Sequence, residues 1–119
     1  MTAQSEASTP VKPVYVDGLD DLTQITTDHP FVLVEFCADR CGPCKRLDSV
    51  LKSIAADTGI TVAKVDIDKN PQLAFVHRAR SVPMIELYSN GERVERIIGV
   101  PSERDLRELI RRYARSAIR

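Results

Sequence analysis

The chain has 119 residues, which is enough for one domain with a single hydrophobic core. Its 17 Lys and Arg residues balance its 17 Asp and Glu residues, so no excess charge favours nucleic acid or an anionic membrane as a partner. No apolar run has the length of a membrane span, and three cysteines are too few for a disulfide-stabilised scaffold.

Residues 1–13 are predicted to form a disordered tail, and residues 14–119 are predicted to form one folded domain. The tail lacks the basic and apolar regions of a secretory signal. It contains Glu6 and no arginine, which argues against a transit peptide. We therefore expect a cytoplasmic location.

The first half of the domain is predicted to alternate strands with helices. Residues 14–16 favour a short strand, and a capping aspartate at position 20 or 21 begins a helix that runs to about residue 26. The near-continuous apolar run 31–37 is typical of a buried strand. The helix after it is predicted from about residue 42 to Gly59, a residue suited to a helix C-terminus.

The second half begins with a predicted buried strand at 61–67 and a helix at 70–78. An Asn-Gly pair then predicts a hairpin between strands at 84–88 and 92–100, and a last helix follows from residue 102. The arginines at the end of that helix are interpreted as a solvated face. Together these elements predict an α/β fold with a central mixed β-sheet of about five strands flanked by about four helices.

The most reactive residues, Cys41 and Cys44, lie where a predicted buried strand leads into a helix. Two cysteines three apart lie on adjacent corners of one helical turn, so their sulfurs can close and reopen a small disulfide ring. Gly42 allows a tight turn and a close approach by another molecule, and Pro43 suits the first turn of a helix. The helix N-terminus, together with Lys45 and Arg40, favours a thiolate at the more exposed sulfur, expected to be Cys41.

A Cys-x-x-Cys pair is by itself a weak signal, because it can also be half of a zinc site or two buried apolar residues. The other possible zinc ligands are Cys37, His29 and His77, and their spacing matches no zinc motif, so no metal is expected. Both histidines are interpreted as surface or helix-end residues. The strand-to-helix context favours redox chemistry, in which Cys41 attacks a partner's disulfide and Cys44 resolves the mixed disulfide.

These segments together resemble the thioredoxin family in order and spacing, from about Val14 to Tyr113. The matching stretches are residues 32–36, 41–45, 62–68, 70–71, 82–83 and 90–92, with Gly99. The resemblance implies the thioredoxin fold and a thiol-disulfide oxidoreductase that reduces protein disulfides through a redox-active Cys41–Cys44 disulfide, without a cofactor. It also implies a thioredoxin reductase as electron donor, and we expect a monomer that binds neither nucleic acid nor membranes.

Glu35 is the only charged residue in its apolar strand. A buried carboxylate has a raised pKa and can accept the proton of Cys44, whose burial is expected to keep its own pKa high. The alternative is a glutamate that reaches water at the sheet edge. Similar proteins carry an acid here, usually aspartate, with a nearby lysine that matches Lys64.

Pro83 resembles the family's cis-proline, which faces the disulfide and exposes the backbone of Val82 to an extended substrate segment. A trans proline that opens a strand is the alternative. The resemblance also adds a shallow docking surface, although Ile67, Gly99 and Val100 fit turn or core positions equally well. The predicted docking residues are Arg40, Gly42, Pro43, Ile67, Val82, Gly99 and Val100.

The chain departs from the family in having no tryptophan. Arg40 and Cys37 stand where similar proteins usually carry one, Ser49 replaces a usual helix proline, and Met84 replaces a small polar residue. These changes bear on partner choice and redox potential, and Arg40 should favour partners with acidic or polar flanks. A dedicated binding module and, more distantly, an oxidase or isomerase are the alternative functions.

Overall fold

The computed structural model describes residues 12–117. The predicted tail of residues 1–13 therefore lies outside the described residues, except for Lys12 and Pro13, which have no regular secondary structure and are exposed. Within residues 12–117 none of the helices has both the length and the apolar character that crossing a membrane would require.

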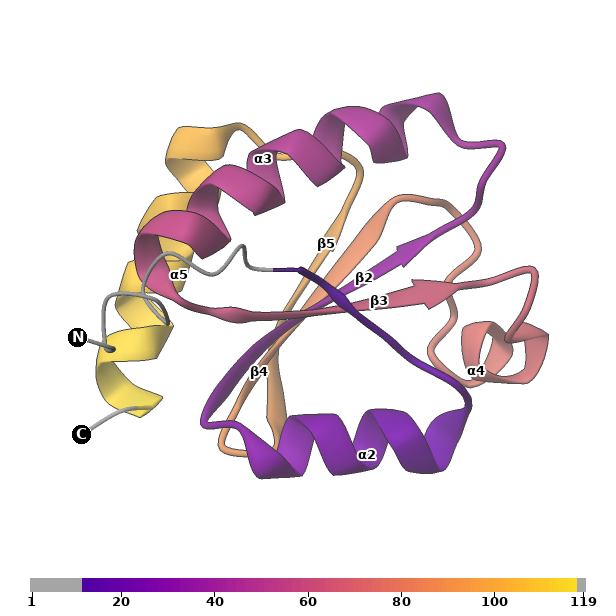
Figure 1. Ribbon diagram of the computed structural model, residues 1–119, viewed down its shortest axis with the longest axis horizontal. Helices are drawn as coiled ribbons and strands as arrows, with labels where there is room; N and C mark the ends of the chain where they lie inside the picture. The colour runs from indigo at the N-terminus through magenta and orange to yellow at the C-terminus, as the bar shows by residue number, and fades with distance from the viewer. Residues whose placement is uncertain (1–11, 118–119) are drawn as a thin grey trace, which may run out of the picture.

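The described residues form five strands and four helices, as predicted (Figure 1). In chain order these are β1 (Val14–Tyr15), α2 (Leu19–Asp28), β2 (Phe31–Cys37), α3 (Gly42–Thr58), β3 (Thr61–Asp66), α4 (Pro71–Val76), β4 (Met84–Ser89), β5 (Glu92–Ile98) and α5 (Glu103–Ala117). The strands form one sheet in the order β1-β3-β2-β4-β5. The first three strands pair in parallel, while β4 is antiparallel to both β2 and β5, so the sheet is mixed.

The predicted cap of the first helix is wrong. Helix α2 begins at Leu19, its N-cap is Gly18 with a φ of 91°, and no side chain caps it. Asp20 and Asp21 lie in the first turn, where their negative charges stabilise the helix by interacting with the positive end of its dipole. Asp21 also accepts a hydrogen bond from the backbone N–H of Asp17 at 2.8 Å, so it fastens the turn before the helix.

Helices cover both faces of the sheet, with α3 and α5 on one face and α2 and α4 on the other (Figure 1). Each face has its own core, and β2 contributes to both because all seven of its residues are buried. Successive side chains of a strand point to opposite faces. Leu33 packs in the core under α3 and α5, whereas Val34 and Phe36 pack in the core over α2 and α4. The same alternation turns Glu35 and Cys37 toward the α3 face.

Candidate functional site

Cys41 and Cys44 lie at the start of α3. Cys41 is the N-cap residue of this helix, with extended backbone angles of −91° and 107°, and its sulfur accepts the backbone N–H of Cys44 at 3.2 Å. This contact and the positive end of the helix both stabilise negative charge on Cys41. Cys41 is 8% exposed and Cys44 is 3% exposed, so Cys41 is the more accessible of two largely covered sulfurs. Both are free thiols in the structure.

Cys37 completes a cluster of three thiols, which the sequence did not predict. It is the last residue of β2, is 3% exposed, and packs with Cys41, Cys44 and the flank of Val82. Its thiol donates a hydrogen bond to Oε2 of Glu35 at 2.8 Å. The signal in the sequence was the i, i+2 spacing of Glu35 and Cys37, which places both on one face of a strand.

Glu35 is 1% exposed, so its carboxylate does not reach water at the sheet edge. Burial is the main reason that its pKa is raised from 4.5 to about 7. The hydrogen bond from Cys37 and the charge of Lys64 act against this rise, while the negative charge of Asp48 adds to it. A carboxyl group with this pKa exchanges its proton near neutral pH.

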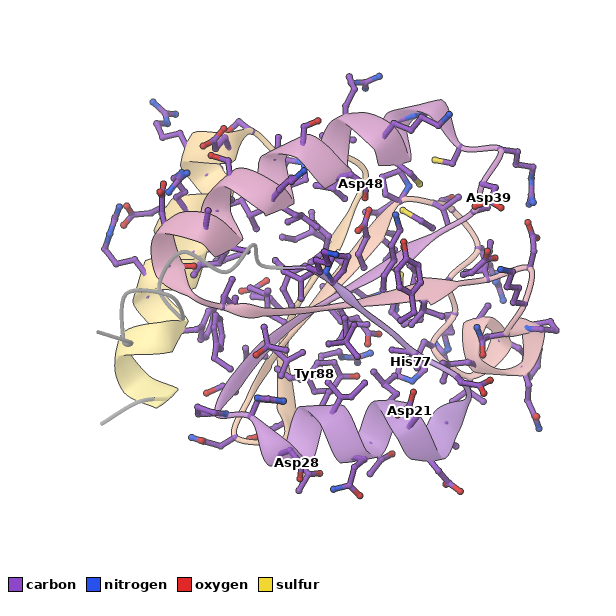
Figure 2. All side chains as sticks on the ribbon, viewed as in Figure 1. Asp21, Asp28, Asp39, Asp48, His77 and Tyr88 are labelled. Carbon is purple, nitrogen blue, oxygen red and sulfur yellow. The ribbon has the colours of Figure 1, made fainter. Side chains whose placement is uncertain are left out.

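Lys64 lies beside Glu35 in the β2–β3 register, but its ammonium group binds another carboxylate. Its Nζ donates to Oδ1 and Oδ2 of Asp48 at 3.1 and 2.9 Å. Figure 2 shows Asp48 on the side of α3 that faces the sheet. Asp48 was not predicted as a site residue, although its position four residues after Cys44 on α3 placed both on one face of the helix.

Two shallow cavities meet around Asp48 and Lys64. One of about 260 Å³ is lined by Glu35 and by apolar residues of α3 and β3. The other, of about 100 Å³, is lined by the three cysteines. Asp48 and Lys64 line both cavities, and the Asp48 side chain is 41% exposed, so the surroundings of Glu35 connect to solvent through this pair.

The Val82–Pro83 bond is cis, as the resemblance implied, and Val82 packs against the cysteine cluster. The Pro83 carbonyl accepts the N–H of Gly99 at 2.8 Å, and this bond holds the end of β5 beside the proline. Gly99 has a φ of 95°, a backbone conformation that favours glycine. Ile98 next to it is 64% exposed and adds apolar surface that was not predicted from the sequence.

The other predicted docking residues differ in exposure. Gly42 and Pro43 are exposed at the first turn of α3. Ile67 and Val100 are half-buried and pack against the two cores, so each is also a core residue. The N–H of Ile67 donates to the Cys37 carbonyl at 2.9 Å, which holds this residue at the end of β2 beside the cysteines.

Arg40 is exposed, and its guanidinium group forms an ion pair with Asp68 after β3. Its side chain is 69% exposed and that of Asp68 is 52% exposed. The hydrogen bond to Asp68 is the main reason that the pKa of Arg40 is raised, and the charge of Cys41 contributes to this rise. The expected effect of Arg40 on the Cys41 thiolate stays a prediction. Arg40 and Asp68 together form a polar rim, in which Asp68 was not predicted from the sequence.

A second buried carboxylate, Glu86, lies on the opposite face of the sheet and was not predicted. It is 0% exposed and contacts Nδ1 of His77 at 3.0 Å, the Tyr88 hydroxyl at 2.7 Å and Arg93 at 3.3 Å. Figure 2 shows His77 and Tyr88 between the sheet and α2. His77 is the C-cap of α4 and His29 is exposed, as the prediction of surface or helix-end positions implied. The His77 side chain is only 13% exposed.

Among residues 12–117, no group of three or more His, Cys, Asp or Glu side chains is arranged to hold a metal ion. The buried side-chain nitrogen and oxygen atoms in the same part of the chain all have hydrogen-bond partners.

Comparison with known proteins identifies the family to which the chain is similar. The family model described as Thioredoxin matches residues 19–112. The thioredoxin of Mycobacterium bovis is 39% identical over 108 residues, which cover 88% of this chain and 90% of that protein. A bifunctional thioredoxin reductase/thioredoxin of Mycobacterium leprae is 33% identical over 115 residues, covering 92% of this chain and 25% of that protein. The solved structure of a mutant thioredoxin from Halobacterium salinarum has a TM-score of 0.82 and 40% identity, covering 89% of this chain and 94% of that one.

Proposed function

The chain belongs to the thioredoxin family of thiol-disulfide oxidoreductases, and we propose that it reduces protein disulfides by dithiol-disulfide exchange through Cys41 and Cys44. The observation that carries this proposal is the hydrogen bond from the Cys44 N–H to the Cys41 sulfur at the start of α3. It supports a Cys41 thiolate in contact with a second thiol. The chain's own cysteines store the two electrons, so the reaction needs no other redox group.

In the first step the Cys41 thiolate attacks one sulfur of a partner's disulfide. A bond forms between Cys41 and that sulfur, and the partner's other sulfur leaves as a thiolate. The N-terminus of α3 stabilises the attacking thiolate. The exposed Gly42 and Pro43 leave room for the partner's backbone beside Cys41.

In the second step Cys44 attacks the Cys41 sulfur, which closes the Cys41–Cys44 disulfide and releases the reduced partner. Burial is the main reason that the pKa of Cys44 is raised to about 11, so few Cys44 thiols are ionised at neutral pH. We assign Glu35 as the group that takes this proton, because its pKa of about 7 lets it accept one at neutral pH. On the side open to solvent, the negative charge of Asp48 raises the pKa of Glu35 and the positive charge of Lys64 lowers it.

We assign substrate docking to the surface around the cysteines. The backbone of Val82, turned by the cis bond to Pro83, is available to pair with an extended segment of the partner. Gly99 and the flanks of Ile67 and Val100 continue that surface. Arg40, paired with Asp68, replaces the usual tryptophan with a polar rim that favours partners with charged or polar flanks.

The electron donor is proposed to be a thioredoxin reductase. A relative in Mycobacterium leprae is a bifunctional thioredoxin reductase/thioredoxin, so a chain similar to this one is joined to a reductase there. A monomeric state and a cytoplasmic location remain predictions, to be tested by light scattering and by cell fractionation.

An insulin-reduction assay tests the function. Dithiothreitol and the protein together should precipitate insulin faster than dithiothreitol alone, and Cys41→Ser should abolish this acceleration. Cys44→Ser should instead accumulate mixed disulfides, which non-reducing electrophoresis detects. Normal turnover by Cys44→Ser would contradict the two-cysteine mechanism. Binding of partners without any turnover by the unmodified protein would favour the dedicated binding module.

NADPH and a thioredoxin reductase should replace dithiothreitol in the same assay. Turnover with dithiothreitol but not with the reductase would leave the disulfide reductase function intact and point to a different electron donor.

A further inference from the structure

The third thiol, Cys37, has no part in the two-cysteine reaction, yet it touches both groups that exchange a proton in it. Its sulfur donates to Oε2 of Glu35 at 2.8 Å on one side. On the other side it packs against Cys44 in the cluster of three cysteines. All three groups are almost fully enclosed, with 1% exposure for Glu35 and 3% for each of the two cysteines.

The enclosed position of Cys44 creates a problem for the resolving step. Its proton must leave before it can attack, and both Cys44 and Glu35 are almost fully covered by the protein. The structure gives no hydrogen bond between the thiol of Cys44 and the carboxylate of Glu35. The group that contacts both is the Cys37 thiol, which is both a hydrogen donor and a hydrogen acceptor.

We propose that the Cys37 thiol relays the proton of Cys44 to Glu35 during the resolving step, a role that rests on the disulfide exchange proposed above. Cys37 gives its proton to the Glu35 carboxylate while it takes the proton of Cys44, so Cys37 begins and ends as a thiol. The Cys44 thiolate then attacks the Cys41 sulfur, the Cys41–Cys44 bond forms, and the partner leaves with the electron pair of the broken bond. Glu35, now protonated, returns its proton to water beside Asp48 and Lys64.

The electrostatics around Cys37 agree with a relay and not with a second nucleophile. Burial is the main reason that its pKa is raised far above the ordinary range, so Cys37 does not persist as a thiolate. A hydrogen bond from Cys37 works against the rise in the Cys44 pKa, as a donor to the Cys44 thiolate would. Cys37 therefore has a hydrogen-bond partner before the transfer, in Glu35, and after it, in Cys44.

Glu35 sets the pH dependence of this route, and the groups that face it come from three elements. Cys37 faces it from β2, Asp48 faces it from α3, and Lys64 faces it from β3. Tyr15 of β1 lies behind Lys64, with its ring centroid 6.0 Å from the ammonium nitrogen. Below pH 7 Glu35 holds a proton and cannot accept another, so the resolving step should slow as the pH falls through about 7.

Stopped-flow reaction of the reduced protein with 5,5′-dithiobis(2-nitrobenzoate) separates the two chemical steps in one trace. The attack of Cys41 releases a first coloured thiolate, and the attack of Cys44 releases a second. In Cys37→Val, which fills the site without a transferable proton, the second release should be slower by on the order of 100-fold at pH 8. Cys37→Ser keeps a transferable proton and should retain most of the rate.

A double-mutant cycle with Glu35→Gln then tests whether the two residues act as one unit. The variants Cys37→Val, Glu35→Gln and their combination should have equally slow second phases, and each should lose the pH midpoint near 7. The relay would be overturned if the two substitutions slowed the second phase by factors that multiply in the double variant. It would also be overturned if Cys37→Ser slowed that phase as much as Cys37→Val, or if Cys37→Val left it unchanged. A disulfide that includes Cys37, found by peptide mapping after the reaction, would overturn it too.

Two further measurements keep the test decisive. The second phase of the unmodified protein should be slower in deuterium oxide, and equal rates in the two solvents would refute the relay without any variant. The first phase reports the proposed function separately. Without a fast first release the disulfide reductase assignment fails, whereas a normal first and second release in Cys37→Val would reject the relay alone.

Discussion

Replacing Glu35 by glutamine should stabilise the protein above pH 7 and have little effect near pH 4. The native carboxyl group has a pKa of about 7, against its ordinary value of 4.5, because it is buried. Between these two pH values the native state holds a proton that the unfolded chain has released. The free energy of unfolding must therefore fall as the pH rises through this interval, and it stays lowered above pH 7.

The magnitude follows from the same two values. At about 1.4 kcal/mol for each pH unit, a rise from 4.5 to about 7 corresponds to roughly 3 kcal/mol. Glu35 is 1% exposed, so solvent screening removes little of this. Glutamine is a good mimic of the protonated acid. Its oxygen can accept from Cys37, and its amide can donate to Asp48 as the protonated carboxyl group does.

Urea unfolding of the dithiol form at pH 4.5, 6 and 8 measures the effect. We expect equal stability at pH 4.5 and an advantage of up to about 3 kcal/mol for Glu35→Gln at pH 8. Glu92→Gln is the matched control, because Glu92 is exposed at the start of β5 and should change stability by less than about 0.5 kcal/mol. A constant difference across the three pH values, or a less stable variant at pH 8, would refute the reasoning.

Three further outcomes are expected. Glu86→Gln should destabilise the protein by about 3 kcal/mol at pH 7 in urea unfolding, because it removes the charge from a buried, fully bonded carboxylate. The native pKa of Glu86 is lowered, so that deficit should shrink as the pH falls below 4.5. Lys64→Met should move the pH midpoint of the resolving step above 7, since the positive charge of Lys64 lowers the pKa of Glu35. Arg40→Gln should leave stability unchanged and lower kcat/KM for peptide disulfides with acidic flanks relative to those with basic flanks.

The fold could be predicted because its elements are encoded locally. The apolar run of β2, the helical spacing after Cys44 and the Asn-Gly turn each indicate one element without reference to the rest of the chain. The start of α2 could not be predicted from residue preferences, because Asp21 uses its carboxylate on the preceding turn and leaves Gly18 at the N-cap. Helix ends depend on such competition between neighbouring hydrogen bonds.

The candidate site was predicted in part. The two motif cysteines, Glu35 and the proline were recognisable from local pattern and resemblance, whereas Asp48 and Cys37 gain their significance from packing between elements far apart in sequence. Lys64 illustrates the difference. The resemblance implied its place near Glu35, and the two are indeed neighbours across β2 and β3, but only the packing of α3 shows that Asp48 binds its ammonium group.

Glu35 and Glu86 show that burial alone does not decide whether the pKa of a carboxyl group is raised. Both carboxylates are almost completely enclosed, yet the pKa of Glu35 is raised and that of Glu86 is lowered. Burial raises both, but Glu86 has hydrogen bonds from the Tyr88 hydroxyl and from Arg93, together with its contact to His77, and these outweigh burial.

Glu35 has the weak donor of Cys37 on one side and the negative charge of Asp48 on the other. The better-bonded carboxylate stays ionised and stabilises the fold, and the poorly bonded one exchanges a proton near pH 7. Adding a strong donor beside Glu35 should therefore increase stability and slow the resolving step together. A Cys37→Asn variant tests this, because its amide N–H should lower the pKa of Glu35 toward that of Glu86. In such a variant the pH dependence of unfolding between 4.5 and 7 should flatten, and an unchanged dependence would show that burial alone fixes the pKa of Glu35.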